Sequence, residues 1–200
     1  MTFEDFSQDY GIRKLDLGER VEAFSCDDED LDDFIINDAP LYREALLAVT
    51  YIIERNSDKE VVGYFSLAND RIAIKDFPSN NEFNKFRRHR FVNEKRLTNY
   101  PSVKLCRFAL SNAVKGKHIG SILLDFMKRY FVSDNKTGCR FLTVDAYRTA
   151  EPFYQKNGFL YLNSADEGKP PRLMFYALIN LEDYPLPFLH YPHFEMMGLV

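Results

Sequence analysis

The chain contains few cysteines, and these show no paired spacing. Cys26, Cys106 and Cys139 are odd in number and far apart, and they include no C-x-x-C pair. Such an arrangement suggests neither a disulfide framework nor a zinc site. We therefore expect three reduced thiols and no bound metal.

Long apolar runs and a strong net charge are also absent. No apolar run reaches the roughly 18 residues that a membrane-spanning helix needs, and the acidic N-terminal segment MTFEDFSQDYG has no hydrophobic signal-peptide core. The formal net charge of −4 gives no general attraction to nucleic acids. With 200 residues, 46% of them hydrophobic, the chain can bury one substantial core. We expect a soluble, cytoplasmic protein that does not associate with membranes.

Two common phosphate-binding motifs are missing as well. A Walker A loop ends in Gly-Lys followed by Ser or Thr, and no such run occurs in the chain. A dinucleotide fingerprint needs G-x-G-x-x-G and an acidic residue about 20 residues later. The chain offers only one of these glycine intervals, so neither class of nucleotide-binding fold is predicted.

The stretch from Lys104 to Tyr130 nevertheless has the pattern of a strand, a basic turn and an amphipathic helix. Leu105, Phe108 and Leu110 indicate the strand, and apolar residues at helical spacing begin at Ile119. The turn between the two elements is therefore placed at the N-terminus of a helix.

This turn is expected to bind an anion. Gly116 and Gly120 remove side chains near the first backbone N–H groups of the helix, and Lys115 and Lys117 add positive charge. A helix N-terminus with free donors and nearby lysines favours a phosphate group. A pyrophosphate is the natural ligand of such a turn.

The sequence of the turn points to one family. KGKHIGS, residues 115–121, resembles the acyl-CoA pyrophosphate loop of the GNAT acetyltransferases, usually written Q/R-x-x-G-x-G/A. Lys115 stands in the first position and Gly120 in the last, whereas His118 replaces the first glycine. A residue other than glycine must adopt an unusual backbone conformation there, and histidine is enriched in the left-handed region. Alternatively, His118 donates to a phosphate.

A second GNAT-like segment follows in the family's order. Residues 138–162 read as strand, helix and strand, and the A-x-x-F-Y-x-x-x-G-F segment of the family is matched by Ala150, Phe153, Tyr154, Gly158 and Phe159. Residues 171–181 then supply a final strand. The resemblance implies an α/β, single-domain GNAT fold, with a central mixed, mostly antiparallel sheet that splays at strands 4 and 5 and is flanked by helices.

The remaining elements are expected from local patterns. Residues 10–18 alternate as a first strand would, and two strands around a turn at residues 56–59 form an antiparallel hairpin. Residues 24–39 indicate a helix with Ser25 or Asp27 as its N-cap, because acidic residues crowd the first turn.

We expect the domain to extend over residues 1–181, with one insertion and a C-terminal arm. The insertion, at about residues 76–100, is polar and strongly basic and is compatible in part with a helix. The arm, residues 182–200, is rich in proline and aromatic residues.

The resemblance also implies a site for acetyl-CoA. In the GNAT fold, the strand that holds Phe108 to Leu110 separates from the strand after Cys139, which leaves main-chain donors for the thioester carbonyl and the pantetheine amides. The implied cofactor-binding positions are Phe108, Ala109, Leu110, Lys115, Gly116, Lys117, His118, Ile119, Gly120 and Ser121.

Tyr154 is the expected catalytic residue. It matches the family's tyrosine, which hydrogen-bonds or protonates the sulfur of the departing CoA; alternatively, it is an aromatic residue that packs under the sheet. Glu151 and Asp145 lie near the right region for a general base, but such carboxylates more often cap helices or lie on the surface. Water could also relay a proton from the amine.

The acceptor is a primary amine that the resemblance leaves open. Residues 24–35 resemble the F-x-C-x-x-x-x-L-x-x-F-L segment of GNAT toxins that acetylate aminoacyl-tRNA, although Asp27 replaces the glycine often found after the cysteine. The basic insertion could contact tRNA phosphates, or it could form a solvated helix; its cations are Lys85, Arg87, Arg88, Arg90, Lys95 and Arg96.

Two other functions remain open. A small-molecule or protein amine could be the acceptor, since the acidic run DDEDLDD could attract a cation. A non-catalytic acetyl-CoA-binding module that uses the aromatic arm as its interface is the alternative from another class. Candidate partners besides acetyl-CoA are tRNA, an antitoxin-like protein in a toxin–antitoxin pair, and a second copy of the chain.

Overall fold

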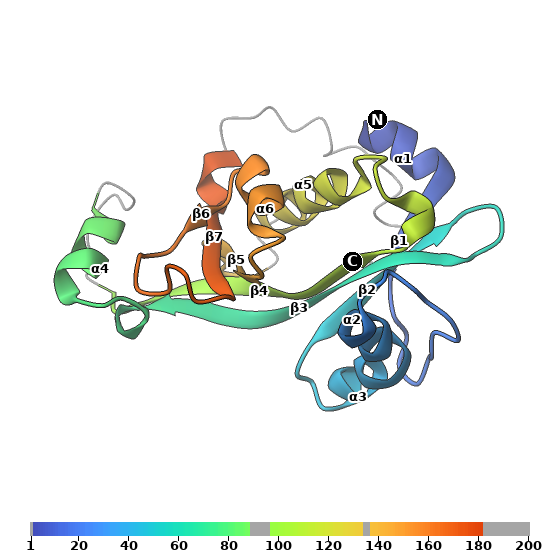
Figure 1. Ribbon diagram of the computed structural model, residues 1–200, viewed down its shortest axis with the longest axis horizontal. Helices are drawn as coiled ribbons and strands as arrows, with labels where there is room; N and C mark the ends of the chain where they lie inside the picture. Colours follow the sequence, from blue (N-terminus) through green and yellow to red (C-terminus); the bar gives the residue numbers. More distant parts are fainter. Residues whose placement is uncertain (1, 89–96, 134–136, 182–200) are drawn as a thin grey trace. The chain divides into compact units, whose positions relative to one another are not determined.

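The computed structural model describes residues 2–88, 97–133 and 137–181 (Figure 1). The strands are β1 (Tyr10–Lys14), β2 (Val49–Arg55), β3 (Val61–Ala73), β4 (Asn99–Leu110), β5 (Phe141–Ala146), β6 (Leu160–Tyr161) and β7 (Arg172–Ala177). The α-helices are α1 (Phe3–Asp9), α2 (Glu29–Asp33), α3 (Ala39–Glu44), α4 (Asn80–Arg87), α5 (Ile119–Val132) and α6 (Glu151–Lys156), and a π-helix, Phe34–Asp38, joins α2 to α3.

The seven strands form one sheet in the order β1-β2-β3-β4-β5-β7-β6. The pairs β1–β2, β2–β3, β5–β7 and β6–β7 are antiparallel, whereas the neighbours β4 and β5 run parallel. The mixed, mostly antiparallel sheet that the sequence predicted is therefore confirmed. None of the described helices is both long and apolar enough to cross a membrane.

The described residues group into two compact units. The first holds residues 2–68 and 105–129, and the second holds residues 69–88, 97–104, 130–133 and 137–181. Both β3 and β4 contribute residues to each unit. Each unit has a buried hydrophobic cluster of its own.

In the first unit, the alternation of side chains along β3 determines which helix covers which face. Tyr64 is fully buried beside Phe34 of the π-helix, with ring centroids 6.0 Å apart, and its hydroxyl donates to the carbonyl of Leu31 at 2.7 Å. The next residue, Phe65, points to the opposite face and contacts Phe126 of α5. Because successive strand residues face opposite sides, α2 and α3 lie on one side of β2 and β3, and α5 lies on the other (Figure 1).

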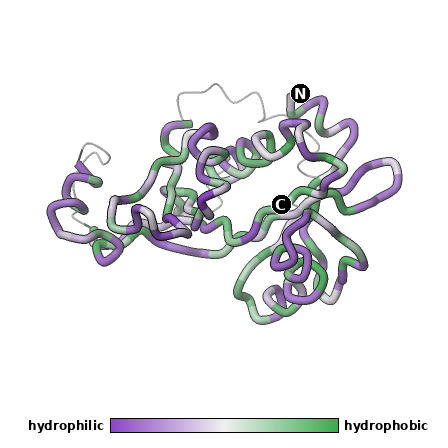
Figure 2. The backbone as a smooth tube through the Cα atoms, viewed as in Figure 1, coloured by the Kyte–Doolittle hydropathy of each residue, from purple (hydrophilic) through white to green (hydrophobic). Residues whose placement is uncertain are grey.

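The predicted hairpin is confirmed, but the predicted helix cap is wrong. Strands β2 and β3 flank the turn at residues 56–60, which Figure 2 shows as hydrophilic. The N-cap of α2 is Asp28, whose carboxylate accepts from the backbone N–H of Leu31 at 3.2 Å, and not Ser25 or Asp27. Asp27 instead has a left-handed backbone with φ of +66°, which keeps it outside the helix.

In the second unit, β5, β7 and β6 pair next to a cluster of aromatic residues. Phe86 of α4 is buried there against Phe141 and Phe175, and Phe83 is buried against Phe77 and Tyr100. The last strand, β7, ends at Ala177, and a 3₁₀ turn covers residues 178–181, so it is shorter than the sequence predicted. The C-terminal arm lies outside the described residues.

A close approach between two strands of the first unit depends on a glycine. A Cβ atom at Gly63 of β3 would lie 2.6 Å from Cδ2 of Leu110 and 3.0 Å from the carbonyl oxygen of Ala109. Gly63 therefore lets β3 pass close to the end of β4, where the sequence places part of the cofactor site.

We predict that Gly63→Ala destabilises the protein by about 1 to 3 kcal/mol, because the added methyl group overpacks this contact. Urea unfolding measures the free energy of unfolding. Gly138→Ala is the matched control, since a Cβ atom there meets nothing within 4 Å, and its effect should stay within about 0.5 kcal/mol. Equal effects of the two substitutions would contradict the prediction.

Candidate active site

The turn between β4 and α5 combines an exposed loop with the start of a helix. The carbonyl of His118 accepts from the backbone N–H groups of Ser121 at 3.1 Å and Ile122 at 3.3 Å, so helical hydrogen bonding begins at His118. The amides of Ile119 and Gly120 belong to the first turn, whose N–H groups have no intrahelical acceptor. Residues 116–118 are exposed. This part of the turn can therefore receive an anion from solvent.

Two residues of this turn have left-handed backbones. Gly116 has φ of +79° and His118 has φ of +63°. The sequence predicted an unusual conformation at His118, because it replaces a glycine of the GNAT loop, and the structure confirms this. Left-handed residues turn successive N–H groups toward one side, which is how backbone concavities bind anions.

The ammonium group of Lys115 contacts a segment far away in the sequence. Its Nζ donates to the carbonyl of Cys26 at 2.8 Å and lies 3.5 Å from the carboxylate of Asp27. Lys115 therefore fastens the turn to the residues that precede α2. Lys117 is also exposed and belongs to the part of the turn that faces solvent. Sequence reasoning assigned both lysines to the phosphate and missed this contact, because no local pattern reports a bond between residues so distant.

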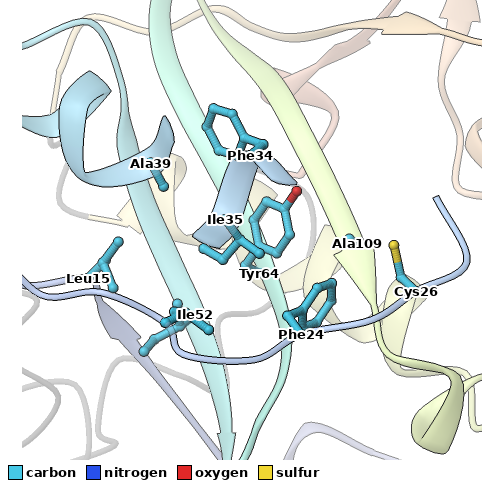
Figure 3. Close-up of a cluster of buried hydrophobic side chains, with 10 residues drawn as sticks. Leu15, Phe24, Cys26, Phe34, Ile35, Ala39, Ile52, Tyr64 and Ala109 are labelled. Atoms are coloured by element: carbon cyan, nitrogen blue, oxygen red, sulfur yellow. The ribbon is translucent and has the colours of Figure 1, made fainter. Parts of the chain in front are cut away.

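The last residues of β4 carry the other expected cofactor positions. The side chain of Ala109 is buried in the cluster that contains Phe34 and Tyr64 (Figure 3). By the alternation of a strand, Phe108 and Leu110 face the other side. After the strand ends, the backbone N–H of Ser111 donates to the carbonyl of Val62 at 2.8 Å, which holds the end of β4 against β3.

Tyr154 lies on α6 in the second unit. Its side chain is 6% exposed, and its ring contacts those of Phe153 and Phe159. Burial raises the pKa of its phenol well above the ordinary value. The hydroxyl therefore stays protonated at neutral pH and can act only as a hydrogen-bond donor or a weak acid.

Both carboxylates considered as general bases have partners. Asp145 of β5 forms an ion pair with Lys104 of β4. Glu151 accepts a hydrogen bond from the hydroxyl of Tyr161 at 2.6 Å, and this bond raises the pKa of that phenol. Each carboxylate thus has a structural contact, and neither is assigned as the base.

Two of the described thiols, those of Cys26 and Cys139, are not activated nucleophiles. Burial raises the pKa of Cys26 to about 12, with a further contribution from the nearby carboxylate of Asp32. Burial also raises the pKa of Cys139. Over the described ranges, no group of three or more His, Cys, Asp and Glu residues could hold a metal ion.

The described part of the basic insertion is a packed helix. In α4, the guanidinium of Arg87 lies over the ring of Phe83 at 5.6 Å, and Phe86 is buried beneath the helix. Lys85 lines a cavity of about 520 Å³. Arg88 ends the helix as its C-cap. Arg90, Lys95 and Arg96 lie outside the described residues.

Comparisons with known proteins agree with this architecture. Residues 90–169 match the family model described as the Acetyltransferase (GNAT) domain. No curated protein sequence matches the chain.

Several solved structures resemble most of the chain. A tyrosine-to-phenylalanine mutant of KacT is 23% identical with a TM-score of 0.70, and the match covers 88% of this chain and 98% of KacT. AtaT complexed with acetyl-methionyl-tRNAfMet is 23% identical with a TM-score of 0.68, covering 87% of this chain and 98% of AtaT. An AtaT mutant toxin bound to the C-terminus of the antitoxin AtaR and acetyl-CoA is 22% identical with a TM-score of 0.65. This match covers 87% of this chain and 96% of the AtaT chain.

The order of strands, the turn before α5 and these matches define a protein with the GNAT acetyltransferase fold. The resemblance predicted from the sequence, including the likeness to toxin-type members, is confirmed. Residues 90–169 thus resemble the GNAT acetyltransferase domain, and the described residues have the fold of that family.

The left-handed backbone at His118 predicts that two substitutions have different effects on CoA binding. His118→Gly should leave the affinity for CoA nearly unchanged, because glycine adopts this conformation freely. His118→Val should weaken binding roughly five- to thirtyfold, because a β-branched residue resists it. Isothermal titration with CoA measures both. Equal losses of affinity in the two variants would mean that the imidazole, which both variants lack, and not the turn, binds the ligand.

Proposed function

We propose that this protein transfers an acetyl group from acetyl-CoA to a primary amine. The observation that carries the proposal is the exposed turn at residues 116–118, which immediately precedes α5 and contains two left-handed residues. In this proposal the amides of residues 116–120 bind the pyrophosphate of CoA, and Lys117 adds positive charge. Lys115 contributes by holding the turn to Cys26.

The main chain at Phe108 to Leu110 is proposed to bind the pantetheine and the thioester. A backbone N–H aimed at the thioester carbonyl stabilises the oxyanion that forms as the amine attacks, and one such donor contributes ~3 kcal/mol. No side chain is needed for this role. The splay of the parallel strands, which the GNAT resemblance implies, would free these donors.

The reaction needs no covalent enzyme intermediate. The amine nitrogen forms a bond to the carbonyl carbon, the tetrahedral intermediate collapses, and the carbon–sulfur bond breaks to release CoA thiolate. Water takes the proton from the amine, consistent with both candidate carboxylates being engaged by other residues. Tyr154 donates a hydrogen bond to the leaving sulfur in this scheme.

Complete proton transfer from Tyr154 to sulfur would be uphill. An ordinary phenol titrates near ~10 and a thiol near ~8.5, a difference of about 2 kcal/mol. Burial raises the pKa of Tyr154 further, while the same desolvated surroundings would also make the thiolate more basic. Stabilisation of the thiolate through a hydrogen bond is therefore the proposed role.

We propose aminoacyl-tRNA as the acceptor. Residues 24–35 carry the toxin-like segment, and the structurally similar AtaT was solved with acetyl-methionyl-tRNAfMet. By the same reasoning, an antitoxin-like protein is the proposed regulatory partner, since the structurally similar AtaT was solved with the C-terminus of the antitoxin AtaR. A second copy of the chain remains a proposed partner.

Thiol release from acetyl-CoA tests this function. Charged tRNA should release CoA thiol, whereas uncharged tRNA, which lacks the amine, should not. A panel of small amines and acceptor peptides serves as the comparison. Thiol release with those amines or peptides but not with charged tRNA would show that the acceptor is not tRNA. Binding of acetyl-CoA without thiol release on any amine would show a non-catalytic binding module.

Tyr154→Phe should lower kcat about 100-fold with little change in acetyl-CoA affinity, because the leaving sulfur loses its hydrogen-bond donor. Steady-state kinetics with titration calorimetry separates the two effects.

In the wild type, activity should not decline through ionisation of Tyr154 as the pH rises to about 9, since the pKa of this phenol is raised.

Tyr161→Phe is the matched control, because the hydroxyl of Tyr161 already donates to Glu151. It should keep kcat within about threefold of the wild type, as expected for a residue outside the chemistry. If Tyr154→Phe retained full kcat, the phenol would be a packing residue.

A further inference from the structure

We propose that Arg107 of β4 binds a backbone phosphate of the acceptor RNA, on the face of the sheet opposite α5. This inference rests on the proposed function and adds a specific contact to the acceptor. Every residue that carries it belongs to the first unit.

The position of Arg107 places it beside the reacting group. It immediately precedes Phe108 to Leu110, whose main chain is proposed to bind the thioester. Arg107 and Ala109 share one face of β4 by strand alternation, and Ala109 is buried in the same cluster as Phe34 (Figure 3). The side chain of Arg107 therefore lies on the α2 side, where an acceptor can approach without displacing the helix that begins at the pyrophosphate turn.

The guanidinium of Arg107 has unused donors. One terminal nitrogen donates to the carbonyl of Cys106 at 3.2 Å. The other lies 3.6 Å from the carboxylate of Asp30, which is beyond hydrogen-bond distance. Nε is buried and has no hydrogen-bond partner among the described residues. A buried donor without an acceptor is costly, and an incoming phosphate oxygen would satisfy it.

An aromatic ring holds the guanidinium in place. The central carbon of Arg107 lies 5.2 Å from the centroid of the Phe34 ring, within the range of a cation–π contact. Stacking fixes the plane of the guanidinium, and the side chain as a whole remains 36% exposed. Arginine in such a setting recognises phosphate through two parallel hydrogen bonds.

The carboxylate of Asp30 competes with an incoming phosphate for the guanidinium of Arg107. Its side chain is 70% exposed, so it can turn away from Arg107 into solvent when a phosphate arrives. Asp30 also belongs to an acidic segment that repels a polyanion. Removing its charge should therefore strengthen RNA binding, although it removes an ion pair from the free protein.

Binding of a fluorescent RNA minihelix that ends in CCA tests the contact without requiring turnover. Arg107→Gln should weaken binding roughly ten- to hundredfold, because a charged hydrogen-bond donor is lost. Arg107→Lys should recover only part of the affinity, because lysine keeps the charge but not the planar fork. Asp30→Asn should bind more tightly than the wild type.

Arg20→Gln is the matched control, since Arg20 is an exposed arginine of the same unit. This variant should bind the RNA minihelix with the affinity of the wild type. Circular dichroism and CoA affinity should be unchanged in all four variants. Equal RNA binding by the wild type and Arg107→Gln, or equal losses for Arg20→Gln and Arg107→Gln, would overturn the proposal.

Kinetics distinguishes this proposal from the function on which it rests. Arg107→Gln should raise KM for charged tRNA and leave kcat unchanged, and it should not affect acetylation of puromycin, an aminoacyl-nucleoside with a free amine and no phosphate. Equal losses on both acceptors would show that Arg107 only supports β4. If the wild type released no thiol with either acceptor, the proposed function would fail, while the minihelix comparison would still decide the phosphate contact.

Discussion

The candidate site depends on the backbone of the turn that joins β4 to α5. Gly116 and His118 adopt left-handed conformations, and helical hydrogen bonding starts at the carbonyl of His118. This geometry leaves the first amides of α5 beside an exposed loop, which is the arrangement that binds phosphate at helix N-termini. Lys115 stabilises the turn by its bond to Cys26. The proposed binding of the CoA pyrophosphate therefore depends on the backbone of this turn.

In the first unit, the alternation of side chains along β3 and β4 places the two proposed binding functions on opposite faces of the sheet. Phe65 faces α5, whereas Tyr64 and Ala109 face the π-helix and α2. One face therefore carries the helix that is proposed to bind the cofactor. The other carries Arg107 stacked on Phe34, with donors proposed for the acceptor. Gly63 permits the close approach of the two strands on which this division depends.

The sequence predicted the elements whose signals are local. The hairpin, the strand before the turn, the helix after it and the left-handed His118 all follow from hydrophobic spacing or from a motif position. Contacts between distant segments have no such signal, and so the bond from Lys115 to Cys26 and the stacking of Arg107 on Phe34 were not predicted. The N-cap was misplaced because several adjacent acidic residues could cap α2, and only the backbone turn at Asp27 selects Asp28.

Titration calorimetry of CoA against pantetheine, which lacks the pyrophosphate, tests the central claim most directly. If the turn before α5 binds the pyrophosphate, CoA should bind with a Kd of about 1 µM to 1 mM, and pantetheine should bind at least about 100-fold more weakly, since several charge-assisted hydrogen bonds are lost. Equal affinity for the two ligands, or no measurable binding of CoA, would contradict the account.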